Sequence, residues 1–286
     1  MSAKSQIGFP VPHRFSGGKA RIGFEKRGSG VYVPAFASSV SGDAPVKISI
    51  VTIVRNNASQ IRETMDSVLN QGFPDLEYIV IDGASTDGTV REIEAYGDRL
   101  AAFVSEPDGG IYDAMNKGIA RATGDVIGLI NAGDSYRPGA LALVEKSFRG
   151  RELDHSIFWG DVIYEKQGLV RGFRPHNLFR GAFAPHPSMF VPRRVYERIG
   201  VYDSSMRYLG DYDFMYRAVN VHKLDVIYVP EPVAFYREGG CSDRHIAGCL
   251  RDELKVKLRY GQNPAKAKTE YFLKLIKNLP RILLAK

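Results

Sequence analysis

The hydrophobic pattern between residues 47 and 130 switches between two periodicities. Four continuous apolar runs are typical of strands that are covered on both faces, at 47–54, 76–82, 100–106 and 125–130. Between them, apolar side chains recur at helical spacing, at 61–69, 89–96 and 111–122. Strands and helices that alternate in this way form a parallel sheet with right-handed crossovers. The stretch therefore predicts an α/β fold with a mostly parallel, Rossmann-like sheet and helices on both faces.

Beyond Ser135 the regular alternation ends. Residues 156–164 and 169–174 read as antiparallel strands, and 186–200 as a strand followed by a helix that starts at Pro192. Residues 211–219 have a helical pattern, and 224–238 are extended. Because no linker separates the two halves, we expect one globular unit whose sheet continues into a mixed half.

The positive charge of the chain is confined to its ends. Residues 1–45 carry six Lys/Arg and two acids, and residues 251–286 carry ten and three, whereas the chain as a whole has a net charge of +7. The middle, 46–250, is therefore mildly acidic. This division predicts an N-terminal extension with a possible hairpin around Gly28–Gly30, a central domain and a basic C-terminal segment. No nucleic-acid module is recognisable, and a basic end is better suited to a bilayer of anionic lipids.

The composition favours a cytoplasmic location, with at most peripheral contact with the inner face of the cell membrane. The two cysteines, Cys241 and Cys249, form no metal or disulfide pattern and fit a reducing compartment. We find no signal-peptide pattern. No run reaches the roughly 18 apolar residues of a membrane-spanning helix.

The C-terminal stretch has an amphipathic helical pattern. Residues Phe272, Ile276, Leu279 and Leu283 fall on one stripe with lysines between them, and Pro280 is expected to kink the helix. Such a helix lies either in a membrane surface, where a lipid-linked acceptor would be found, or packed on the domain.

Small polar residues and carboxylates follow each of the first four predicted strands. The strand ends read TIVRNN, IDGASTDGT, SEPDGG and INAGD. Ligands of parallel sheets bind at the carboxyl edge of the strands. The pattern thus predicts a polar rim around a cleft.

The usual glycine-rich cradles for dinucleotides and triphosphates are missing, so side chains would have to hold a nucleotide. Asp82 can accept a hydrogen bond from a base, and Asn56, Asp108 and Asn116 can bond ribose or base. Asp134 is the candidate ligand for Mg²⁺ or Mn²⁺, which prefer oxygen atoms and share them with substrate phosphates.

At these positions the sequence resembles the family 2 glycosyltransferases, which have the GT-A fold, in their bacterial exopolysaccharide and O-antigen branch. The resemblance covers about residues 45–220 and rests on five stretches: SIVTIVRNNASQIRETMDSVLNQ, EYIVIDGASTDGT, SEPDGGIYDAMNKGIARATGDVIGLINAGD, HPSMFV and GDYDF.

The resemblance implies an inverting transfer of a sugar from a nucleotide diphosphate, with UDP favoured over GDP, to a hydroxyl of a saccharide acceptor in cell-surface polysaccharide synthesis. We expect this acceptor to be lipid-linked. By motif position it assigns nucleoside contacts to Thr52 and Asp82, the same pocket to Asp108 and Asn116, the metal to Asp134, and the catalytic base to Asp211.

The acidic motif of this sequence contains fewer acidic residues than the family pattern. Asn131 and Gly133 stand where the family usually has further acids, which leaves Asp134 alone and Asn131 as a donor-binding candidate. A single carboxylate can still hold Mg²⁺ together with phosphate oxygens and waters. We expect weak metal affinity without the nucleotide.

Simpler interpretations stay open at several positions. Asp82 could cap a helix, Asp134 could be a turn residue, and either Asp211 or Asp213 could be only a helix cap. At a helix start, Asp211 is expected to have a low pKa.

His186 and Arg237 could contact acceptor or diphosphate, or be ordinary loop residues, and Tyr112 is expected to pack. The alternative functions are a sugar nucleotidyltransferase, which would want a basic glycine-rich loop after the first strand, and a non-catalytic nucleotide-sugar-binding homologue.

Overall fold

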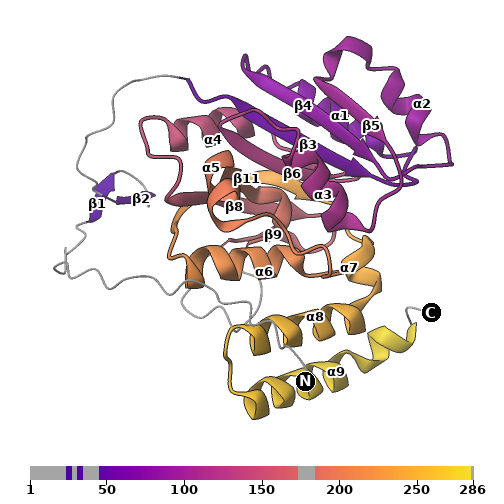
Figure 1. The fold of residues 1–286 in the computed structure, drawn as a ribbon, viewed down its shortest axis with the longest axis vertical. Helices are drawn as coiled ribbons and strands as arrows, with labels where there is room; N and C mark the ends of the chain where they lie inside the picture. Colours follow the sequence, from indigo (N-terminus) through magenta and orange to yellow (C-terminus); the bar gives the residue numbers. More distant parts are fainter. Residues whose placement is uncertain (1–23, 28–30, 35–44, 173–183, 285–286) are drawn as a thin grey trace, which may run out of the picture. The chain divides into compact units, whose positions relative to one another are not determined.

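The computed structural model describes residues 24–27, 31–34, 45–172 and 184–284 (Figure 1). The chain divides into two compact units, residues 1–39 and 40–286. In the first unit, strands β1 (Phe24–Arg27) and β2 (Val31–Pro34) pair antiparallel as a hairpin. The predicted turn of this hairpin and residues 173–174 of the strand predicted at 169–174 lie outside the described residues.

The second unit is built on a nine-stranded sheet with the order β5-β4-β3-β6-β10-β8-β11-β7, and β9 pairs with β8. The strands are β3 (Ile48–Val54), β4 (Leu76–Asp82), β5 (Ala102–Ser105), β6 (Val126–Asn131), β7 (Ser135–Tyr136), β8 (Ser156–Tyr164), β9 (Gly168–Val170), β10 (Met189–Pro192) and β11 (Asp225–Tyr236).

Six of these strands end at the same edge of the sheet. Strand β3 is parallel to β4 and β6, and β4 is parallel to β5. Strand β10 is antiparallel to both β6 and β8, so β6 and β8 run in the same direction, and β11 is parallel to β8. The carboxyl ends of β3, β4, β5, β6, β8 and β11 therefore form one edge, where ligands of α/β sheets bind.

Helices cover both faces of this sheet (Figure 1). Helices α1 (Ile61–Leu69), α2 (Thr89–Glu94) and α4 (Ala140–Phe148) contribute buried side chains to one apolar cluster. Helices α3 (Ile111–Ile119), α5 (Arg193–Ile199), α6 (Gly210–Tyr216) and α8 (Ile246–Arg259) contribute to the cluster on the other face. The remaining elements are η1 (Gly97–Arg99), η3 (His186–Ser188), the π-helix η4 (Arg217–Val221), α7 (Cys241–Arg244) and α9 (Pro264–Leu284).

The predicted α/β class, with a mostly parallel sheet that continues into a mixed half, is confirmed. The strand predicted at 76–82 matches β4, and the helix predicted at 111–122 ends earlier, at Ile119. Helix α3 lies close to β3 because residue 118 is glycine: a Cβ there would lie 2.1 Å from Cγ1 of Val51. Helix α9 continues past Pro280 to Leu284. Among the described residues, no helix combines the length and the apolar content that crossing a membrane requires.

Candidate functional site

The carboxyl edge of the sheet gathers most of the predicted site residues. Asp82 and Asn131 are the last residues of β4 and β6. On the other half of the edge, Tyr164 and Tyr236 end β8 and β11. The alternation of strands and helices predicted the first half of this edge, whereas the second half depends on pairing that the hydrophobic pattern does not reveal.

Asp82 is fully buried and shapes the loop that follows β4. Its Oδ2 accepts hydrogen bonds from the backbone N–H of Ser85 at 2.9 Å and the hydroxyl of Ser105 at 2.7 Å. The hydroxyl of Ser85 donates to the other oxygen. Asp82 does not cap a helix, because α2 begins only at Thr89. The carboxylate instead fixes the backbone of the loop at the edge.

Asn56 and Asp108 flank the same loop. The side-chain oxygen of Asn56 accepts from the N–H of Thr86 at 2.8 Å, and Asn56 itself has a φ of 51°. Asp108 accepts from the N–H of Gly110 at 3.0 Å. Its Oδ2 lies so close to Gly83 that a Cβ there would be 2.3 Å away. Both side chains therefore stand at the edge where the prediction put them.

Thr52 and Asn116 have partners inside the protein. Thr52 is fully buried, and its hydroxyl shares a 2.9 Å hydrogen bond with the hydroxyl of Tyr78. The Asn116 amide donates to the carbonyl of Tyr202 at 2.8 Å and accepts from its N–H at 3.0 Å. These bonds tie α3 to the segment before α6, so a direct nucleoside contact of either residue stays a prediction.

Helix α1 holds the turn from Asn131 to Asp134 in place through Thr64. The hydroxyl of Thr64 donates to the carbonyl of Asp134 at 2.7 Å and accepts from the N–H of Gly133 at 2.9 Å. Gly133 has a φ of 106°, which side-chain-bearing residues rarely adopt. The geometry of this turn is thus fixed before any ligand binds.

Asp134 presents an unpaired oxygen in this turn. Only 4% of the residue is exposed, and Oδ1 accepts from the N–H of Arg237 at 3.0 Å. Among the described residues, its Oδ2 and the Oδ1 of Asn131 are buried without a hydrogen-bond partner. Burial raises the pKa of Asp134 to about 7. Two unpaired oxygens in one turn fit a hard divalent cation, which prefers oxygen ligands.

Arg237 and His186 lie near the turn from Asn131 to Asp134. The guanidinium of Arg237 pairs with Glu63 at 2.5 Å, so its charge is partly neutralised. His186, at the start of η3, has a buried Nε2 that has no partner among the described residues. Burial lowers the pKa of His186 to about 4, so at neutral pH its ring is uncharged.

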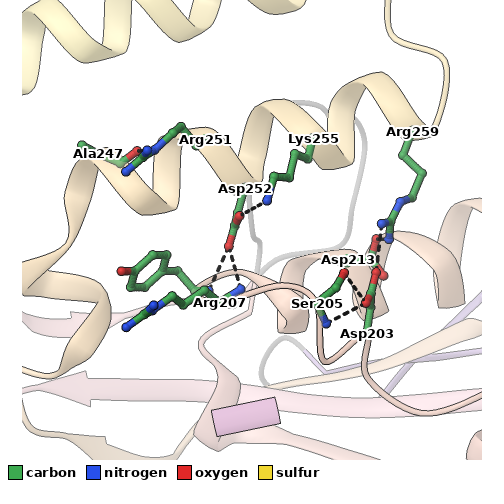
Figure 2. A network of polar contacts seen from close by, with 10 residues as sticks. Asp203, Ser205, Arg207, Asp213, Ala247, Arg251, Asp252, Lys255 and Arg259 are labelled. Atoms are coloured by element: carbon green, nitrogen blue, oxygen red, sulfur yellow. Dashed lines mark hydrogen bonds and ion pairs between the residues drawn. The ribbon is translucent and has the colours of Figure 1, made fainter. Parts of the chain in front are cut away.

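The two acids at the start of α6 differ in their surroundings. Asp213 is buried and accepts from Arg259 at 2.8 Å (Figure 2). It also accepts from the hydroxyl of Tyr260 at 3.2 Å. Among the described residues, Asp211 accepts from uncharged donors: the N–H of Tyr212 at 2.8 Å and the hydroxyl of Tyr112 at 3.2 Å. The Tyr112 hydroxyl shares its proton with the carbonyl of Tyr208, 2.8 Å away. Asp213 is therefore structural, and Asp211 is the carboxylate that suits a base.

Burial raises the pKa of Asp211, although the hydrogen bonds of Tyr212 and Tyr112 oppose this effect. The expectation of a low pKa from the helix start is therefore wrong, because desolvation outweighs the favourable backbone contact. Tyr112, expected only to pack, also contacts the candidate base.

Three residues of the site were missed from the sequence: Tyr164, Tyr236 and Asp243. The two tyrosine rings lie 4.6 Å apart between centroids, and the hydroxyl of Tyr236 donates to Asp243 at 3.1 Å. Burial, followed by the charges of Asp243, Asp211 and Asp134, raises the pKa of Tyr164 to about 12. Tyr164 is thus within electrostatic range of all three carboxylates. The only sequence signal was an aromatic residue at the end of two extended runs.

The family model for glycosyl transferase family 2 matches residues 49–209. The chain is 34% identical over 182 residues to an uncharacterized glycosyltransferase of Mycobacterium tuberculosis, a match that covers 61% of this chain and 69% of the relative. It is 31% identical over 221 residues to a PGL/p-HBAD biosynthesis glycosyltransferase of Mycobacterium bovis, covering 74% and 86%. The chain belongs to glycosyl transferase family 2 and is a glycosyltransferase, as the motifs predicted.

Solved structures of GT-A glycosyltransferases share the fold. A mannosyltransferase from Pyrobaculum calidifontis, solved with GDP-Man and Mn²⁺, has a TM-score of 0.62 at 19% identity, covering 88% of this chain and 77% of that one. TarS of Staphylococcus aureus, residues 1–349 with UDP-GlcNAc, has a TM-score of 0.57 at 15% identity, covering 84% and 79%. The chain spans 43% of a longer TarS chain. The predicted GT-A fold is confirmed.

Proposed function

We propose that this glycosyltransferase is a metal-dependent, inverting enzyme that moves a sugar from a nucleotide-diphosphate sugar to a hydroxyl of a lipid-linked saccharide. We place it in cell-surface polysaccharide synthesis, at the inner face of the cell membrane. The observation that carries the proposal is the pair of unpaired, buried oxygens of Asn131 and Asp134 at the carboxyl edge. Structural neighbours that bind UDP-GlcNAc or GDP-Man with Mn²⁺ support the choice of donor class.

Asp134, assisted by Asn131, would hold Mn²⁺ or Mg²⁺ in this site. Burial raises the pKa of Asp134 to about 7 because the loss of hydration outweighs the charge of Arg237, and a divalent cation would supply the missing positive charge. When bound, the ion neutralises the charge that develops on the departing diphosphate.

Asp211 acts as the base in the proposed mechanism. The acceptor oxygen attacks the anomeric carbon from the face opposite the leaving group, the bond to the diphosphate breaks, and the hydroxyl proton passes to Asp211. Its raised pKa makes it a stronger base than an ordinary aspartate, and the Tyr112 hydroxyl orients it by bonding Oδ1.

The loops after β3 and β4 supply the proposed nucleoside pocket. Asn56 and Asp82 fix these loops, and Asp108 lies beside them in the loop after β5. We propose Thr52 and Asn116 as further contacts of the nucleoside. We propose UDP as the nucleotide to test first and GDP as its competitor, because neighbours of this fold bind either one. His186 and Arg237 lie on the opposite side of the edge, where we place the diphosphate and the acceptor.

A thermal-shift screen tests the donor and the metal together. We expect a UDP-sugar to raise the melting temperature with Mn²⁺ present and much less in EDTA, since a ligand that binds only the folded state stabilises it by mass action. Transfer should likewise stop in EDTA and return with Mn²⁺. Full activity in chelator would show that Asp134 holds no ion.

A further inference from the structure

Helix α9 is attached to the protein through a face that carries both apolar and charged side chains. It packs on α8, where Ala267 is buried and Tyr271, Leu275 and Ile282 are half-buried. Lys274 pairs with Glu253 at 2.5 Å, and Glu270 pairs with Lys257 at 2.8 Å. A surface helix needs only one such face toward the protein, so a second apolar face on it calls for an explanation.

A second apolar face of α9 faces solvent. Five large apolar residues on it are between 47% and 68% exposed: Phe272, Leu273, Ile276, Leu279 and Leu283. The other exposed large apolar side chains of the described residues, Leu169, Val201, Val221 and Leu258, are scattered over separate elements. One contiguous apolar stripe of this kind marks an interaction site rather than ordinary surface.

The charges beside the stripe indicate what covers it. Lys268, Lys277 and Arg281 lie on α9, are exposed, and form no ion pair among the described residues. The segment 251–286 carries ten Lys/Arg and three acids. A second copy of the chain would bring this positive charge against itself, whereas an anionic lipid surface complements it.

We propose that α9 lies in the surface of a bilayer that contains anionic lipids, with the stripe from Phe272 to Leu283 among the acyl chains. Of the two sequence interpretations, membrane contact and packing on the domain, the exposed stripe favours the first. Binding of this kind combines buried apolar area with electrostatic attraction, and it needs no membrane-spanning segment. The proposal does not depend on the donor, the metal or the base.

Docking through α9 would also position the candidate base. Asp252 on α8 accepts from the N–H groups of Arg207 at 3.1 Å and Tyr208 at 2.9 Å, just before α6 (Figure 2). Arg259 at the end of α8 pairs with Asp203 and Asp213. Helix α8 is thus fastened to the segment that carries Asp211, so the lipid-facing helix and the candidate base are held by one network.

Co-sedimentation of the full chain with vesicles tests the proposal. We expect binding to vesicles of phosphatidylcholine and phosphatidylglycerol in equal parts, weak binding to phosphatidylcholine alone, and release by salt, which screens the attraction. The double variant Phe272→Ser, Ile276→Ser should bind the mixed vesicles at least about tenfold more weakly.

A matched control is the pair Leu169→Ser, Val221→Ser, which removes equally exposed apolar side chains elsewhere and should leave vesicle binding unchanged. The pair Lys268→Gln, Lys277→Gln should weaken binding to the mixed vesicles and leave binding to phosphatidylcholine as it was. The melting temperatures of all variants should match that of the parent, because the substituted side chains are exposed.

Two outcomes would overturn the proposal. One is a chain that does not sediment with the mixed vesicles, or that binds both vesicle types equally. The other is a dimer in sedimentation velocity that the Phe272→Ser, Ile276→Ser variant dissociates, which would show that the stripe is a contact between copies. Neither readout requires catalysis, so failure here is separate from failure of the proposed function.

Discussion

Two neighbouring parts of the carboxyl edge, the ends of β3 and β4 and the region around the end of β6, treat their polar atoms in opposite ways. At the ends of β3 and β4, the side chains of Asn56 and Asp82 bond to neighbouring loops. At the ends of β6 and before β10, Asn131, Asp134 and His186 keep buried atoms without partners among the described residues. An unpaired buried group costs about 1–3 kcal/mol. The difference suggests that the loops after β3 and β4 shape the site, whereas the residues around the end of β6 are arranged to bind a ligand.

The largest expected effect tests whether Asp211 is the base. Asp211→Asn should lower kcat by about 10²–10⁴-fold, the typical contribution of a general base, while the melting temperature stays close to that of the parent. Asp213→Asn is the matched control: it should keep most of kcat and lose about 1–3 kcal/mol of stability, because the ion pair with Arg259 loses its buried negative partner. Equal kcat values for the two variants would contradict the division of roles.

The second-largest effect tests whether the unpaired oxygens of Asn131 and Asp134 bind a metal ion. Asp134→Asn should abolish the Mn²⁺-dependent thermal shift and lower kcat/KM by about 10²–10³-fold, because the ion loses its charged ligand. Asn131→Asp restores a second carboxylate to the turn and should tighten Mn²⁺ about tenfold, measured by calorimetry. If Asn131→Asp left the Mn²⁺ affinity unchanged, Asn131 would not face the ion.

A smaller effect tests Asn116, whose side chain is already hydrogen-bonded within the protein. Asn116→Ala should lower the free energy of unfolding by about 1–3 kcal/mol, because it leaves the N–H and carbonyl of Tyr202 without their partner. Denaturant titration measures this change, and KM for the donor should be nearly unaltered. A large rise in KM with unchanged stability would show instead that Asn116 contacts the nucleoside.

The smallest effect is a displacement of the pH profile. Asp211 works in its ionised form, so activity falls as the pH drops through its pKa. The hydroxyl of Tyr112 stabilises that form and lowers the pKa. Tyr112→Phe should therefore move the acidic limb to higher pH, with a change in the maximal rate of less than about tenfold. A limb that stays in place would mean that Tyr112 only packs.

The sequence allowed the parallel half of the sheet to be predicted almost residue by residue. The run at 76–82 is β4, and the helical spacing of Ile61, Met65 and Val68 is the buried side of α1. These elements are local and strongly periodic, so their pattern is visible in one chain. The loop positions of Asn56, Asp82 and Asp108 followed, because parallel strands bring their carboxyl ends together.

The other half depends on long-range contacts that no local pattern shows. Nothing in residues 224–238 reveals that β11 lies parallel to β8, and only this pairing brings Tyr236 beside Tyr164. As residues at a helix start, the acids at 211 and 213 are equivalent in the sequence. What distinguishes them is that Asp213 bonds Arg259, which lies 46 residues away along the chain. The direction of the Asp211 pKa likewise depends on burial, which a helix-start pattern does not report.

Strand β10 runs against its neighbours between β6 and β8. It therefore brings its amino end, and with it His186, to an edge that is otherwise made of strand ends. Residues 184–188 lead into Met189 at this edge, and the register of the sheet does not constrain the length of the chain ahead of β10. Insertions and exchanges there would alter the proposed acceptor side and leave the proposed ion site and nucleotide loops as they are.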